Sequence, residues 1–120
     1  MSERPADDGP LVVLVSDDLL ARARVESAVR GADARLRVVP ADTSLAGIAD
    51  LAPALVLVDL DARSDDAVGP IGRKGHVPVL AFFSHVHPEA AATARSGGWQ
   101  ALPRGRFWRE LPELVAAALV

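Results

Sequence analysis

The residues best suited to chemistry are aspartates that follow the most apolar runs of the chain. Asp59 ends the run ALVLVD, Asp61 lies two positions further on, and Asp17 follows the run LVVLV. A carboxylate at the edge of a core is costly to bury unless a partner offsets its charge. Two such carboxylates close together repel each other unless a positive group lies between them. The sequence therefore predicts a charged site where these runs end.

The apolar runs are the elements that must position those aspartates. Three of them, at 11–15, 54–59 and 77–83, show no polar alternation, which is typical of strands that are buried on both faces of a parallel sheet. Runs at 34–40 and 100–103 are further strand candidates nearer an edge of the sheet. In such a sheet ligands collect at the carboxyl ends of the strands, where the aspartates lie.

Helical segments are expected between these strands. The expected helices cover residues 18–30, 44–51 and 88–95 and a C-terminal segment whose regular part is opened by Pro112, and the connection at 62–76 is weakly helical. Strands that alternate with helices indicate an α/β fold, a three-layer doubly wound sandwich. Asp17 also has an ordinary structural role open to it, because Asp17 or Ser16 can cap the first helix.

Composition limits the classes of function. A length of 120 residues with half of them apolar suits one domain, expected at 11–120 after a flexible tail at 1–10. The net charge is −3 and the arginines are scattered, so neither nucleic acid nor a membrane surface is an expected partner. There is no cysteine, and no apolar stretch approaches the roughly 18 residues of a membrane span. We expect a cytoplasmic protein.

The acidic segments VSDD and DLD resemble those of the receiver domains of bacterial two-component response regulators, and the resemblance covers residues 11–120. The family's fold is flavodoxin-like, with a five-stranded parallel sheet in the order 2-1-3-4-5. The resemblance implies that Asp59 is the phosphoacceptor. It also implies that Mg²⁺ is held by Asp17, by Asp59 and by the backbone carbonyl of Asp61.

Other positions depart from the pattern of that family. Ser16 replaces an acidic residue, Phe83 falls on the usual hydroxyl position with Ser84 one place later, and Arg104 replaces a lysine. The loss of an acidic side chain at position 16 weakens the binding of a divalent ion, because it removes one oxygen ligand. A guanidinium is planar, permanently charged and suited to a bidentate grip on a carboxylate. We therefore expect Arg104 to hold Asp59 directly.

These departures favour a pseudo-receiver, a stand-alone signalling module that binds other proteins without obligatory phosphorylation and is not an enzyme. The alternative is a working phosphoacceptor of a two-component phosphorelay, in which Mg²⁺ is bound, Ser84 supplies the hydroxyl and Arg104 binds phosphate. A third hypothesis is a small hydrolase with Asp59 as nucleophile, because DLD resembles the aspartate pair of haloacid-dehalogenase-type phosphatases.

Two histidines lie beside the expected pocket, two positions apart. His85 and His87 could contribute to a Zn²⁺ site, but a third ligand at a recognisable spacing is missing. A loop that enters the next helix is the simpler interpretation. His85 is nevertheless placed to respond to pH or to hydrogen-bond Asp59.

An aromatic and basic cluster near the C-terminus is the candidate partner interface. It consists of Trp99, Arg106, Phe107 and Trp108. Tryptophan and arginine are common anchors of protein interfaces, although buried packing also explains these aromatic residues. In receivers the face made by the fourth helix, fifth strand and fifth helix, the 4-5-5 face, carries such contacts. The expected partner is a sensor kinase, a downstream effector or a second copy of the chain.

Overall fold

Five parallel strands form the centre of the molecule. Their bounds are Leu11–Val15 for β1, Arg35–Val39 for β2, Leu55–Asp59 for β3, Val79–Phe83 for β4 and Gln100–Pro103 for β5. The order in the sheet is β2-β1-β3-β4-β5, and every neighbouring pair is parallel. The predicted order 2-1-3-4-5 is thus confirmed. The computed structural model describes residues 9–63, 68–71, 77–84 and 88–119.

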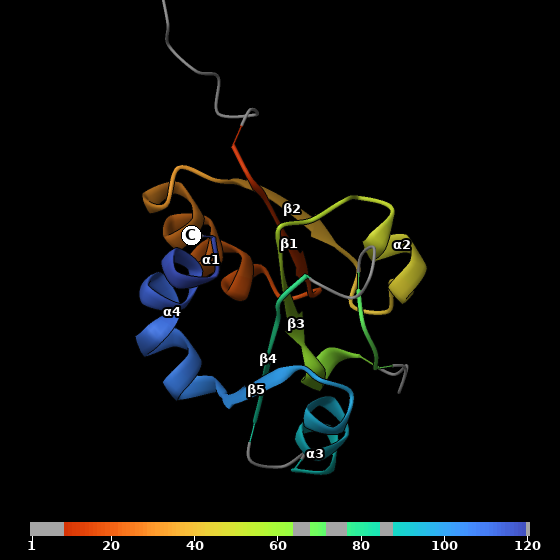
Figure 1. The fold of residues 1–120 in the computed structure, drawn as a ribbon. Helices are drawn as coiled ribbons and strands as arrows, with labels where there is room; N and C mark the ends of the chain where they lie inside the picture. The colour runs from red at the N-terminus through yellow and green to blue at the C-terminus, as the bar shows by residue number, and fades with distance from the viewer. Residues whose placement is uncertain (1–8, 64–67, 72–76, 85–87, 120) are drawn as a thin grey trace, which may run out of the picture.

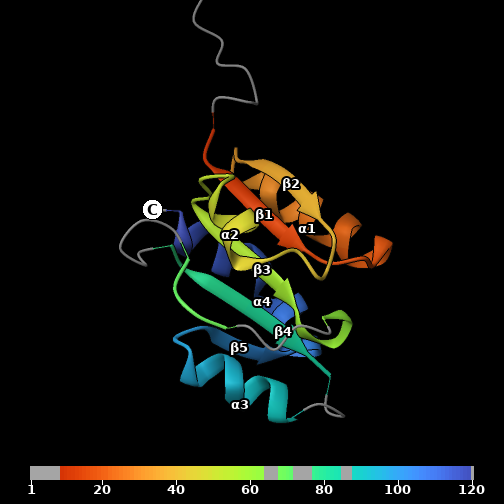
Figure 2. The same ribbon diagram turned by 90° about the vertical axis from the view of Figure 1, so that its right-hand side faces the viewer.

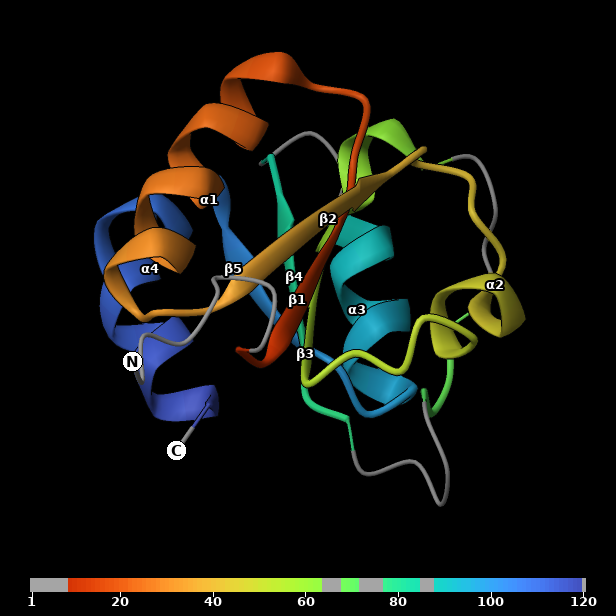
Figure 3. The ribbon, with the colours of Figure 1, turned by 90° about the horizontal axis from the view of Figure 1, so that it is seen from above.

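Helices cover both faces of this sheet and complete three layers. The helices are α1 at Leu19–Gly31, α2 at Leu45–Ala49, α3 at Pro88–Ser96 and α4 at Arg104–Ala118, and a 3-10 turn, η2, covers Leu60–Ala62. Seen from above, α1 and α4 lie on one side of the sheet, and α2 and α3 lie on the other (Figure 3). Figure 1 shows the same division, and Figure 2 views the sheet from the side of α2 and α3.

The central strands are buried on both faces, as their apolar runs predict. Successive side chains point to opposite faces of a strand, so Val13 and Val15 pack toward α2 and α3, whereas Val12 and Leu14 pack toward α1 and α4. All four side chains have no exposed surface. Because β1, β3 and β4 are parallel neighbours, their carboxyl ends lie at the same rim of the sheet.

The last helix differs from its prediction. It begins at Arg104, directly after β5, and Pro112 lies inside it, so the expectation that Pro112 opens the regular part is wrong. Proline removes one helical hydrogen bond. However, the buried residues Phe107, Leu111 and Val115 are spaced by four positions on both sides of Pro112. Their burial against the sheet keeps the helix continuous.

The connection between β3 and β4 contains η2 as its helical element among the residues that are described there, 60–63, 68–71 and 77–78. The rest of the expected weak helix, residues 64–67 and 72–76, lies outside the described part of the chain, as do residues 1–8 of the expected tail. No helix within the described ranges is long and apolar enough to cross a membrane.

Candidate functional site

Asp59 lies at the carboxyl end of β3 with 2% of its surface exposed. Its Oδ1 accepts a hydrogen bond from the backbone N–H of Asp61, 3.1 Å away, which caps the turn η2. Its Oδ2 accepts a hydrogen bond from the hydroxyl of Ser16 at 3.0 Å. Ser16 is itself buried, and its oxygen accepts the backbone N–H of Asp18. Both carboxylate oxygens of Asp59 therefore have donors within the protein.

Arg104, the first residue of α4, connects three aspartates from two other segments. Its Nη1 lies 3.1 Å from Asp59 Oδ1 and 3.1 Å from Asp61 Oδ2. Its Nη2 lies 3.0 Å from Asp18 Oδ2. The guanidinium also stands over the ring of Phe82, 4.9 Å from the ring centroid. The expected contact between Arg104 and Asp59 is thus present. The guanidinium lies between the acidic segments that follow β1 and β3, as the sequence predicts.

The charged side chains of this site differ in how far they are exposed to water. The side chain of Asp59 is 2% exposed, whereas those of Asp61 and Asp18 are 21% and 39% exposed. Burial by itself lowers the pKa of Arg104, but the hydrogen bond and charge of Asp59, followed by the charges of Asp61 and Asp18, outweigh it and raise that pKa. Arg104 therefore stays charged. The buried carboxylate is paired, and the excess negative charge remains on the two carboxylates that reach solvent.

Asp18, and not Asp17, is the acid from the first strand end that joins the site. Asp17 is exposed, and its Oδ1 accepts the backbone N–H of Ala41 at 3.0 Å. Asp18 is also the N-cap of α1, because its side chain accepts the N–H of Leu20. The expectation that Asp17 or Ser16 caps the helix, and that Asp17 meets Asp59 and Arg104, is wrong. The chain turns outward at Asp17 and returns at Asp18.

Ser84, and not Phe83, is the residue after β4 that reaches the site. Its N–H donates to Asp61 Oδ1 at 3.0 Å, and its hydroxyl lies 3.3 Å from the same oxygen. Phe83 is buried in the core beneath α2 and α3, with the guanidinium of Arg95 5.7 Å from its ring. The hydroxyl thus orients Asp61, and among the described residues Ser84 makes no hydrogen bond with Asp59. His85 and His87, for which a metal-binding or pH-sensing role was considered, lie outside the described residues.

The predicted partner interface is largely core. Trp99 is 4% exposed and its Nε1–H donates to the carbonyl of Gly69 at 2.9 Å, while Phe107 has no exposed surface. These two residues cannot serve as contact anchors, because sheet packing has already buried them. Arg106 is exposed and pairs with Glu110 one helical turn away. Trp108 is half-buried and lies toward α1, against Phe107 and Arg24.

The side chains do not fit Mg²⁺ as the resemblance implies. Within the described ranges, no group of three or more histidine, aspartate or glutamate residues is placed to hold a metal ion. Mg²⁺ needs several oxygens in octahedral geometry, but Asp59 Oδ1, Asp61 Oδ2 and Asp18 Oδ2 are bonded to Arg104. The expected ligand Asp17 is directed to Ala41. The guanidinium occupies the place in which a cation would bridge these carboxylates.

Sequence reasoning missed two contributors to the site, Asp18 and Phe82. An acid immediately before an apolar helix start is a capping signal that could have identified Asp18. Phe82 lies on β4, paired with Asp59 on β3, so its ring faces the α1 and α4 side directly beneath Arg104. Strand pairing is needed to place it there, and the chain pattern alone does not supply it.

Comparisons with known proteins identify the fold. No family model and no curated protein matches the chain. Among solved structures, the ChxR receiver domain from Chlamydia trachomatis is 15% identical, with a TM-score of 0.61 over 92% of this chain and 97% of that chain. The receiver domain of NtrX from Brucella abortus is 23% identical, with a TM-score of 0.64 over 90% and 97%. HP1043, an orphan response regulator of H. pylori, is 15% identical, with a TM-score of 0.65 over 95% and 99%.

These likenesses show that the chain has the flavodoxin-like fold of response-regulator receiver domains.

Proposed function

We propose that this protein is a pseudo-receiver, a receiver fold that signals through binding to another protein and does not depend on phosphorylation. The observation that carries the proposal is the full set of donors around Asp59. Ser16, the N–H of Asp61 and Arg104 all donate to this one buried carboxylate. A side chain that is already satisfied by its own protein is a poor acceptor for an incoming phosphoryl group.

Ser16 supports this proposal because its hydroxyl can donate a hydrogen bond to Asp59, whereas an ionised carboxylate cannot. Its O–H donates to Asp59 Oδ2 at 3.0 Å inside a region from which water is excluded. An ionised carboxylate at position 16 would instead repel Asp59 unless a cation lay between them. The departure from the receiver pattern at this position therefore suits an Asp59 that is held without a metal ion.

Arg104 supports it for a related reason. A lysine is a compact point charge, whereas the two terminal nitrogens of Arg104 reach three carboxylates at once. Phosphoryl transfer to Asp59 would require an oxygen free to attack and a cation to offset charge on the phosphoryl oxygens. Here Arg104 must first leave both Asp59 and Asp61. We accordingly propose that the chain has no catalytic activity of its own.

One observation favours the alternative, a working phosphoacceptor. The carboxylates of Asp18 and Asp61 remain partly open to water, and the hydroxyl of Ser84 lies next to Asp61. If Arg104 swung away from Asp59, these groups would surround the strand end. A single assay separates the two proposals.

The test is the intact mass of the protein after incubation with acetyl phosphate and Mg²⁺. We expect no gain of about 80 Da in the wild type, while a receiver that accepts phosphate from acetyl phosphate serves as the positive control. A wild-type gain that disappears in Asp59→Asn would overturn the pseudo-receiver proposal and establish the alternative. The variant Ser16→Asp with Arg104→Lys examines the cause, since a gain in that variant alone would assign the loss of phosphorylation to these two residues.

A further inference from the structure

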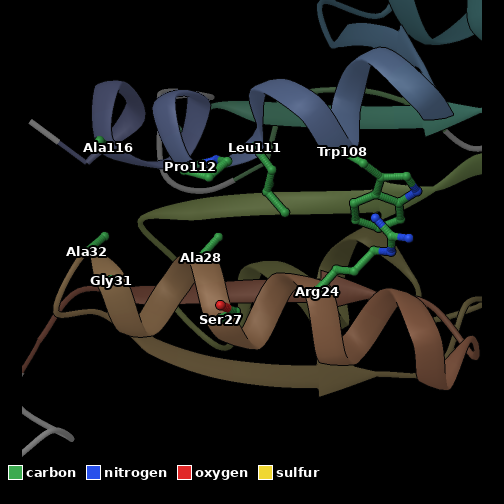
Figure 4. A pocket seen from close by; sticks show the side chains of 9 residues that line it. All are labelled: Arg24, Ser27, Ala28, Gly31, Ala32, Trp108, Leu111, Pro112 and Ala116. Carbon is green, nitrogen blue, oxygen red and sulfur yellow. The ribbon is translucent and has the colours of Figure 1, made fainter.

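A hollow of about 430 Å³ lies between α1 and α4, away from the aspartate site. Its walls include Arg24, Ala28 and Ala32 from α1 and Trp108, Pro112 and Ala116 from α4 (Figure 4). The facing residues are mostly small, so the two helices leave room between them. The volume is within the range of roughly 300 to 1,000 Å³ that is usual for small-molecule sites in proteins.

The charged and aromatic groups of the hollow gather at one end. Figure 4 shows the side chains of Arg24 and Trp108 extending toward each other from the two helices, and the guanidinium lies 5.4 Å from the centre of the indole ring. Trp108 is half-buried and Arg24 is exposed. Within the described part of the chain, no carboxylate forms an ion pair with Arg24. This end therefore offers an indole ring and, beside it, a guanidinium that has no ion-pair partner among the described residues.

We propose that this groove binds a small planar aromatic molecule that carries an anionic group. The aromatic part would pack against Trp108 and the apolar floor made by Leu111, and the anion would pair with Arg24. The hydroxyl of Ser27 on the same helix offers a further hydrogen bond. The proposal goes beyond the pseudo-receiver function and does not depend on the state of Asp59.

Charge argues against a second copy of the chain as the occupant. In a symmetric dimer the same patch meets itself, so the exposed guanidinium of Arg24 would approach its own copy. An anionic small molecule instead neutralises the charge of Arg24. The observations thus favour a ligand over self-association.

The probe is 8-anilino-1-naphthalenesulfonate, an aromatic sulfonate, and binding is measured by isothermal titration calorimetry on the folded wild-type chain. We expect a single saturable site. Arg24→Gln should weaken binding about ten-fold, because it removes a charge-assisted contact without touching the core. Ala28→Leu should weaken it by a similar factor of about ten, because the larger side chain fills the hollow. Circular dichroism confirms that each variant remains folded.

Arg37→Gln is the matched control, because Arg37 is an exposed arginine that lines a different hollow beside β2. We expect it to bind the probe as the wild type does. N-phenyl-1-naphthylamine, which lacks the sulfonate, should bind more weakly and should be insensitive to Arg24→Gln. Affinity that is unchanged in both Arg24→Gln and Ala28→Leu, or that falls equally in Arg37→Gln, overturns the proposal. A concentration-dependent dimer in sedimentation that Ala28→Leu abolishes would also overturn it in favour of a second copy.

Discussion

The two faces of the sheet are covered in different ways. On one face α1 and α4 have 13 and 15 residues, and their core includes the stacked rings of Phe82 and Phe107, 4.6 Å apart. On the other face α2 and α3 have 5 and 9 residues and cover a core that is mostly aliphatic. The first face is covered by two long amphipathic helices, and the second is covered by much shorter ones.

The second face compensates with hydrogen bonds from side chains to backbone carbonyls. Trp99 donates to Gly69, Arg95 donates to Ala101, and Arg63 donates to Ala41 and Thr43. Such bonds fix irregular segments that have no helical partner of their own. The features that can do chemistry, the Arg104 site and the groove, both involve α1 and α4. The face with the longer helices and the stacked rings thus carries the candidate functions, and the other face completes the fold.

The largest effect should come from truncating an aromatic ring on the α1 and α4 face. Phe107→Ala should lower the free energy of unfolding by about 4 kcal/mol, because it removes a fully buried ring that contacts Phe82 and Trp108. Phe83→Ala on the opposite face should cost roughly 1 kcal/mol less, because that ring has no stacked aromatic neighbour among the described residues. Urea denaturation measures both. Equal losses would remove the distinction between the two faces.

The next effect concerns the rim of the sheet. Arg104→Ala should lower the free energy of unfolding by about 2 to 3 kcal/mol, because it leaves the buried carboxylate of Asp59 without its cation. Arg106→Ala is the control on the same helix. It breaks only an exposed pair with Glu110, so its cost should be about 0.5 kcal/mol or less. If thermal or urea unfolding gives the two variants similar stabilities, Arg104 does not stabilise Asp59 as inferred.

A smaller effect should come from a single hydrogen bond on the α2 and α3 face. Trp99→Phe keeps an aromatic ring in the core but removes the hydrogen bond to the carbonyl of Gly69, and it should cost about 1 kcal/mol. Hydrogen exchange of the backbone amides near Gly69 should rise more than that of α1. A uniform rise over the whole chain would contradict a local role for this bond.

Most of the fold could be predicted from the sequence because the apolar runs are the strands. The runs at 11–15 and 100–103 match β1 and β5, and the other three strands fall inside their expected ranges. The expectation for Pro112 was wrong because the preference against proline inside helices reflects only the local loss of a hydrogen bond and a steric clash. The burial of Phe107, Leu111 and Val115 is a tertiary effect, and it outweighs that cost.

The site could be predicted in part. Asp59, Ser16 and Arg104 follow strand ends, so their meeting at one rim depends on the topology that the runs already indicate. Whether Asp17 or Asp18 reaches Arg104 depends on the conformation of the turn between β1 and α1. The spacing of apolar residues does not determine that conformation. For Trp99 and Phe107 the sequence left packing and a partner interface open, and the structure shows packing, because burial depends on which helix covers which strand. Types of residue do not distinguish a core aromatic from a surface anchor.

The ring of Phe82 contacts both the charged rim and the indole of Trp108. Its ring lies under the guanidinium of Arg104, 4.9 Å away, and its centroid is 5.2 Å from that of Trp108. The chain has two tryptophans, so Trp99→Phe leaves a single indole. In that variant the emission of Trp108 should respond to changes at Phe82, Phe107 or Arg24, the groups that contact its ring, so a single fluorophore would monitor the groove.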